Sequence, residues 1–158
     1  MTADLNFVIE LSAKKWINLL SQMGYNDKWI VELDRPKLEG YKEVIEHVLK
    51  AQDALYNKKE PEDVLRDLRS ARDAFKTFLD ANMEKITQII DSGSIGERDQ
   101  KSKSDRIKDI YDKIAYFLNI GPHNDKYEVT FADAKLAFQE FVSVLSYLSL
   151  ILNQATKQ

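Results

Sequence analysis

Apolar residues recur at intervals of three and four along most of the chain, and this spacing places them on one face of an α-helix. Only five glycines and three prolines interrupt the 158 residues, which argues against a turn-rich sheet protein. We therefore expect an all-α fold, an antiparallel bundle of four to five helices without a sheet. The predicted helices cover about residues 4–23, 37–57, 61–90, 105–119 and a last segment from residue 130 onward. The predicted core includes Phe75, Phe78, Ile110, Ile114, Phe117, Leu145 and Leu148.

Residues that commonly start or stop helices support these boundaries. Gly24 follows the first helix, where glycine readily adopts the left-handed backbone that ends many helices. Pro36 and Pro61 stand at the first turns of the second and third helices, where the missing N–H of proline costs nothing. Thr130 and Asp133 have the spacing of a capping box, with Asp in place of the usual Glu or Gln.

The length suits one domain, so we expect residues 1–158 to form a single helical domain. Within it, residues 36–158 form the bundle core, and residues 1–35 supply an N-terminal helix and a connection that packs against it. Residues 92–104 are polar and contain two glycines. We expect them to form a mobile loop that a protease cuts early.

The last helix is apolar around most of its circumference, which predicts burial on more than one side. Ser143, Ser146 and Ser149 recur every third residue, and such small side chains let a second helix approach closely. Two arrangements remain open: a two-fold dimer through this helix, or cover by the helix at residues 4–23 within one chain. The residues expected at the interface are Phe141, Leu145, Leu148 and Leu152.

Composition narrows the function classes. The chain has no cysteine, which excludes disulfides, thiolate metal sites and a cysteine nucleophile and is in keeping with a cytoplasmic protein. The formal net charge of -3 gives no bulk attraction for nucleic acid, so binding of that kind needs a local patch. The start has no signal-peptide pattern, and the longest uncharged stretch, residues 141–156, is short for a membrane span. We therefore expect no membrane contact.

Few residues offer chemistry. No phosphate-binding loop or dinucleotide fingerprint is present, and two histidines, His47 and His123, are too few for a typical histidine metal site. We expect no metal and no cofactor. Arg66, Arg69 and Arg72 lie along one helix stripe and could bind an anion such as phosphate or RNA. Acids interleave with them, which favours ordinary ion pairing instead.

The segment from Leu118 to His123 says most about function. A helix ends there, a Gly-Pro turn follows, and a lone histidine precedes a polar loop and the last helix. This arrangement resembles the HEPN superfamily (higher eukaryotes and prokaryotes nucleotide-binding domains). The signature of that family is Arg, a polar residue that is often Asn, three further residues and His, at the end of one helix and ahead of the last. Asn119 and His123 match the polar and histidine positions.

The resemblance extends over about residues 40–155. Residues 60–75 are similar to the earlier helix of prokaryotic members, and residues 116–123 followed by 129–138 are similar to their closing helices. It implies a helical bundle, often dimeric, from a family in which many members are metal-independent RNases. It also implies that the motif's Arg and His act together on the scissile phosphate.

Leu118 stands where the motif has its Arg, and this departure implies loss of the charge that stabilises the transition state. We therefore expect a catalytically inactive interaction module, a homodimer or the partner of another protein, that regulates or scaffolds a nucleic-acid-processing or defence complex. One alternative is an RNase in which His123 and Asn119 act with an Arg from elsewhere. The second alternative is a nucleotide or anion-binding module. The candidate arginines for the RNase are Arg69, Arg72 and Arg106, and those for anion or nucleic-acid binding are Arg66, Arg69, Arg72 and Arg106.

Overall fold

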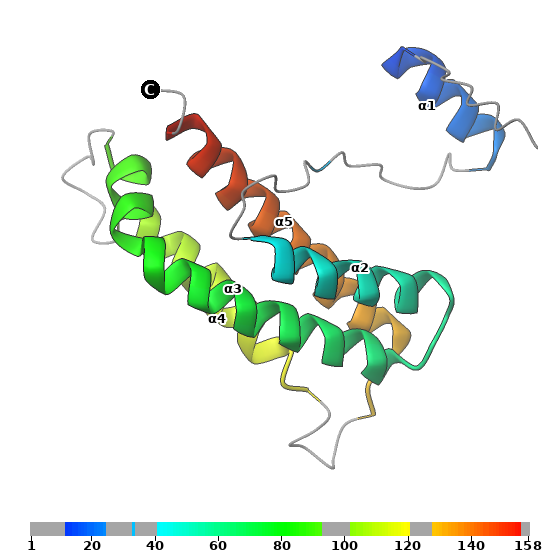
Figure 1. Ribbon diagram of the computed structural model, residues 1–158. Coiled ribbons are helices and arrows are strands. Elements are labelled where there is room, and N and C mark those ends of the chain that lie inside the picture. The colour runs from blue at the N-terminus through cyan, green and yellow to red at the C-terminus, as the bar shows by residue number, and fades with distance from the viewer. Residues whose placement is uncertain (1–11, 25–32, 34–40, 93–101, 121–127, 156–158) are drawn as a thin grey trace, which may run out of the picture. The chain divides into compact units, whose positions relative to one another are not determined.

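The computed structural model describes residues 12–24, 33, 41–92, 102–120 and 128–155. They form five helices and contain no strand, so the predicted all-α fold is confirmed (Figure 1). The helices are α1 (Ala13–Gln22), α2 (Lys42–Tyr56), α3 (Pro61–Ile90), α4 (Lys103–Phe117) and α5 (Phe131–Ala155).

The chain divides into two compact units, Met1–Glu32 and Leu33–Gln158. The prediction of a single domain over residues 1–158 stays a prediction. In the first unit, Ser12 caps α1 by accepting a hydrogen bond from the N–H of Lys15 at 3.4 Å. Gly24 has φ of 86°, so the predicted glycine stop is confirmed.

Local signals set the starts of the helices in the second unit. Pro61 occupies the first turn of α3 as predicted. Before α5, the Thr130 N–H donates to Asp133 at 2.8 Å and the Asp133 N–H donates to the Thr130 hydroxyl at 3.2 Å, which confirms the capping box. The Thr130 hydroxyl also donates to the Asp133 carboxylate, and this bond holds the pKa of Asp133 below its usual value.

The fourth helix begins earlier than the sequence predicted. Ser102 and Asp105 form a capping box, in which the Asp105 N–H donates to the Ser102 hydroxyl at 3.0 Å and the Ser102 N–H donates to Asp105 at 3.3 Å. The end of the predicted 92–104 loop is therefore helical, and the prediction is wrong there. The rest of that loop, residues 93–101, lies outside the described residues, as do 25–32, 34–40 and 121–127.

The second unit is built around α5, which contacts α2, α3 and α4 (Figure 1). Phe141, Leu145, Leu148 and Leu152 are each at most 3% exposed because these three helices cover them. Their assignment to an interface is wrong: they belong to the core of their own chain. Phe131–Asn153 is also long and apolar enough to cross a membrane by length and composition, a test that core helices of soluble proteins pass as well.

Two other predictions about the core need correction. Ile110 is 49% exposed, because α4 turns the face of Ser104, Tyr111 and Ile114 toward the bundle. Ser146 and Ser149, which were expected to let a second helix approach, are buried within the bundle, whereas Ser143 is exposed. The remaining predicted core residues are buried or half-buried. They are Phe75, Phe78, Ile114, Phe117, Leu145 and Leu148.

Phe75 joins the four helices of the second unit through a cluster of aromatic rings. Its ring centroid lies 5.7 Å from that of Tyr41 just before α2, 5.6 Å from Tyr111 in α4 and 6.2 Å from Phe141 in α5. The rings of Tyr111 and Phe141 stand edge-on to it, an arrangement that adds to the gain from burial.

The two tyrosines of this cluster differ in how their hydroxyls are satisfied. Tyr41 is fully buried, its hydroxyl has no hydrogen-bond partner, and burial raises its pKa far above the usual value. The Tyr111 hydroxyl donates to the Arg72 carbonyl oxygen at 3.2 Å, and burial raises the pKa of Tyr111 to about 12. An unmade hydrogen bond in the core destabilises the fold, whereas a made one stabilises it.

We expect Tyr41→Phe to stabilise the protein and Tyr111→Phe to destabilise it, each by about 1 kcal/mol. The same atom is removed from two rings of one cluster, so each variant is the control for the other. Urea denaturation monitored by circular dichroism measures both free energies of unfolding. Equal losses in the two variants would contradict the assignment of an unsatisfied hydroxyl to Tyr41.

Candidate functional site

Two arginines of α3 hydrogen-bond to the C-terminal end of α4, which leads into the predicted motif. Arg69 donates from Nη1 to the carbonyl oxygen of Leu118 at 2.9 Å. Arg72 donates from Nη1 to the side-chain oxygen of Asn119 at 2.9 Å and to the carbonyl oxygen of Ala115 at 3.4 Å. The last carbonyls of a helix lack partners within the helix, and cationic donors satisfy them well. These arginines therefore serve as the cap of α4.

The motif itself is only partly described. Leu118 is fully buried and continues the apolar face of α4 into the core. Asn119 is exposed and is held by Arg72. His123 lies outside the described residues, so its distance from any guanidinium stays open.

The arginine stripe does not present three unpaired cations. Arg66 pairs with Asp63 at 2.8 Å, and Arg72 pairs with Asp73 at 2.8 Å. Arg69 is committed to the α4 carbonyl, and burial lowers the pKa of its guanidinium. Nearby acids thus take part of the charge that an anion would need, as the ion-pairing interpretation of the sequence expects.

The fourth candidate, Arg106, lies in the first turn of α4, whereas Asn119 follows the opposite end of that helix. The twelve residues between Arg106 and Leu118 correspond to about 18 Å along a helix axis. The structure therefore brings Arg69 and Arg72 to the motif, and it places Arg106 near the opposite end of α4.

The opposite end of the α3–α4 pair is also held by polar contacts. Asp91, the residue that ends α3, accepts hydrogen bonds from both the N–H and the hydroxyl of Ser104 in α4. The N–H contact is 3.0 Å long, and Ser104 is 5% exposed. The Ser104 hydroxyl bond holds the pKa of Asp91 below its usual value. The sequence analysis assigned Ser104 to a loop, so no sequence pattern predicted its contact with Asp91.

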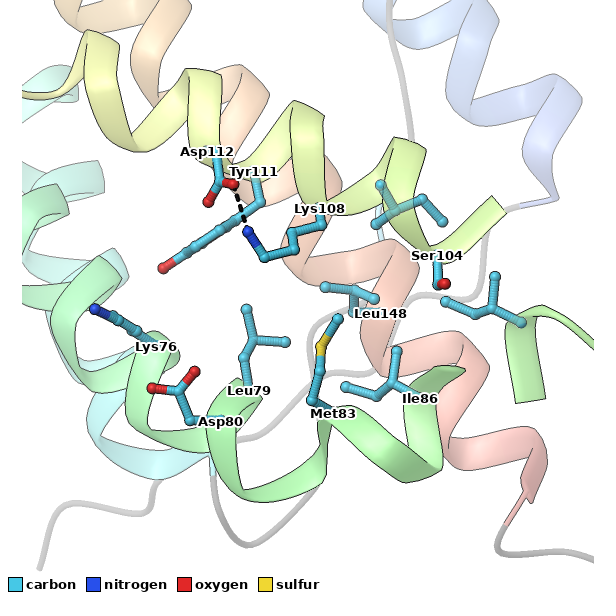
Figure 2. A pocket seen from close by; sticks show the side chains of 12 residues that line it. Lys76, Leu79, Asp80, Met83, Ile86, Ser104, Lys108, Tyr111, Asp112 and Leu148 are labelled. Carbon is cyan, nitrogen blue, oxygen red and sulfur yellow. Dashed lines mark hydrogen bonds and ion pairs between the residues drawn. The ribbon is translucent and has the colours of Figure 1, made fainter. Parts of the chain in front are cut away.

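Between these two polar ends lies a cavity of about 250 Å³. Figure 2 shows Leu79, Met83 and Ile86 of α3 facing it, with Leu148 of α5 behind them. Charged side chains gather at one side, where Lys108 pairs with Asp112 at 2.7 Å. The complete lining is Lys76, Leu79, Asp80, Met83, Ile86, Ile90, Ser104, Ile107, Lys108, Tyr111, Asp112 and Leu148.

No protein-family profile, curated protein or solved structure matches this chain. Within the part that the structure describes, no three His, Asp or Glu side chains stand close enough together to hold a metal ion. The polar contacts between α3 and α4 define the α3–α4 seam, the contact line from the arginine cap to the Asp91–Ser104 contact.

The Asp91–Ser104 contact predicts a dependence of stability on pH. The folded pKa of Asp91 lies below the unfolded value of about 3.9, so its bonds stabilise the fold above that pH and are lost as pH falls through the folded pKa. A double-mutant cycle of Asp91→Ala and Ser104→Ala should give a favourable coupling free energy at pH 7 that shrinks below about pH 4. Urea denaturation at several pH values measures it. A coupling unchanged at pH 3 would refute this assignment.

Proposed function

We propose that this chain is a helical bundle of the HEPN type without nuclease activity, and that it works as an interaction module. The observation that carries the proposal is the burial of Leu118. Its side chain is 0% exposed, at the position where the family has its catalytic Arg. A guanidinium built on this position would start inside the apolar core, away from a phosphate at the surface.

The cap formed by Arg69 and Arg72 supports the same proposal. Each guanidinium donates hydrogen bonds to the end of α4, and Arg72 also pairs with Asp73. Their positive charge is thereby used to hold two helices together. Catalysis of phosphate cleavage instead requires donors aimed at the place where negative charge develops.

The outer side of α5 supports association with a second copy or another protein. Leu136 and Leu150 are 47% and 42% exposed, and the exposed Ser143 lies midway between them. Seven-residue spacing puts the three side chains on one stripe, here called the outer stripe, with a small residue at its centre. This stripe takes the place of the buried residues that the sequence suggested for an interface.

Through such a stripe, the module would form a homodimer or bind a protein partner in the cytoplasm. An inactive relative of a nuclease family can regulate an active enzyme or scaffold a nucleic-acid-processing or defence complex. Both roles require a stable surface and no chemistry of the module's own.

One contact favours the second candidate function, a metal-independent RNase. Arg72 comes from another helix and lies 2.9 Å from the side-chain oxygen of Asn119, four residues before His123. An Arg supplied in this way could replace the missing motif Arg and stabilise charge on a phosphate. No comparable contact favours the third candidate, anion binding along the arginine stripe of α3, because Asp63 and Asp73 already pair with two of its arginines.

We expect the purified protein and the variant His123→Ala both to leave single-stranded RNA intact in the presence of a metal chelator. The measurement is gel electrophoresis of end-labelled RNA over time. Cleavage that disappears in both His123→Ala and Arg72→Ala, but persists in Arg66→Ala, would replace the proposal with the RNase. Arg66 is a suitable control because it is an exposed member of the arginine stripe and pairs with Asp63 of its own helix.

We expect the protein to sediment as a dimer at micromolar concentration and the double variant Leu136→Glu, Leu150→Glu to sediment as a monomer. The two glutamates would remove the stabilisation that both leucines gain by burial in the dimer interface. They leave the core unchanged, because both positions are exposed in one chain. Leu49→Glu in α2 is the matched control, because Leu49 is 40% exposed and lies off the stripe. Circular dichroism checks folding. A double variant that remains dimeric would remove the outer stripe from the interface.

A further inference from the structure

The cavity between α3 and α4 is not used by the proposed function. We propose that it is a binding site for a small uncharged amphiphile, a molecule with an unbranched aliphatic chain and a polar head without net charge. The proposal is independent of the outer stripe and of the motif around Asn119. It rests on the polar contacts that fix α3 to α4, the side chains that line the cavity and the charges at its rim.

Polar contacts limit the length of the opening. The bonds of Arg69 to Leu118 and of Asp91 to Ser104 fix the two helices to each other at both ends. The α3 residues between these contacts that line the cavity run from Lys76 to Ile90, about 21 Å along the helix axis. A groove that lies between two such contacts suits a compact ligand better than a helix of a partner, which would have to extend past both contacts.

The interior is lined mainly by aliphatic side chains. Leu79, Met83, Ile86 and Ile90 follow one another at helical spacing along α3, and Ile107 of α4 and Leu148 of α5 line the same cavity. Unbranched chains fit such flexible aliphatic walls, and methionine adapts its shape readily. A cavity of about 150 Å³ lined by similar residues holds a benzene molecule, so this larger cavity has room for an alkyl chain.

The polar groups inside the cavity already have partners. The Ser104 hydroxyl donates to Asp91, and the Tyr111 hydroxyl donates to the Arg72 carbonyl oxygen. A ligand atom at either place therefore gains little by being polar. The interior selects for hydrocarbon, and any polar head of the ligand lies at the rim.

The rim carries a balanced set of charges. Lys76 and Asp80 come from α3, while Lys108 and Asp112 come from α4 and pair at 2.7 Å. Figure 2 shows these four side chains grouped at one side of the cavity. A head group of either sign meets like and opposite charges in equal number, whereas a hydroxyl can hydrogen-bond to both. This balance favours an uncharged head.

The test is a calorimetric titration of the full chain with hexan-1-ol, octan-1-ol and decan-1-ol. We expect one saturable site whose Kd falls by about fourfold for each added methylene. Decanoate and decylammonium should bind at least tenfold more weakly than decanol. Absence of saturation with every alcohol would overturn the site, and tighter binding of either charged compound would overturn the uncharged head.

Two tryptophan variants localise the binding. Met83→Trp fills the cavity from α3 and Ile107→Trp fills it from α4, so each should weaken decanol binding more than tenfold. Ile110→Trp is the control, because Ile110 is on α4, 49% exposed and outside the lining. Circular dichroism identifies any variant that does not fold. If one of the two tryptophan variants fails to fold, the other tests the location of the site. An equal loss in Ile110→Trp would overturn the location. If the parent protein binds no alcohol and Met83→Trp dissociates a dimer, the cavity would instead be a contact site for a second copy of the chain.

Discussion

The apolar surface of α5 is the constraint on which the bundle depends. A helix that is apolar on most sides cannot rest against one neighbour, so α2, α3 and α4 each contact it. Phe141 on α5 meets Phe75, and that ring in turn meets Tyr41 and Tyr111. The aromatic cluster thus lies where the four helices converge, and Leu136 and Leu150 of the outer stripe are among the α5 side chains that remain exposed.

The seam between α3 and α4 is held differently. Its ends are joined by polar contacts, Arg69 with Leu118 and Asp91 with Ser104, while its middle leaves a cavity above Leu148. Directional bonds at the ends fix the register of the two helices without requiring tight packing between them. This arrangement explains how a stable bundle can keep an apolar cavity near its surface.

The same contacts bear on chemistry. Arginines at the end of a helix either complete its hydrogen bonds or attract a phosphate, and here Arg69 and Arg72 do the first. With Leu118 in the core, the end of α4 has the architecture of a structural joint. The contact of Arg72 with Asn119 also fits an RNase, so activity measurements on variants of this contact discriminate between the two proposals.

The sequence by itself determined the features that depend on neighbours along the chain. The all-α class, the start of α3 at Pro61, the Thr130–Asp133 cap and the stop at Gly24 all follow from interactions within a few residues. The tertiary structure alone decided which apolar residues are covered and where the arginines bind. Arg69 reaches a carbonyl 49 residues away, and the exposure of Ile110 depends on which side of α4 faces α3 and α5. Periodicity defines the faces of a helix, but only the packing of other helices fixes which face is buried.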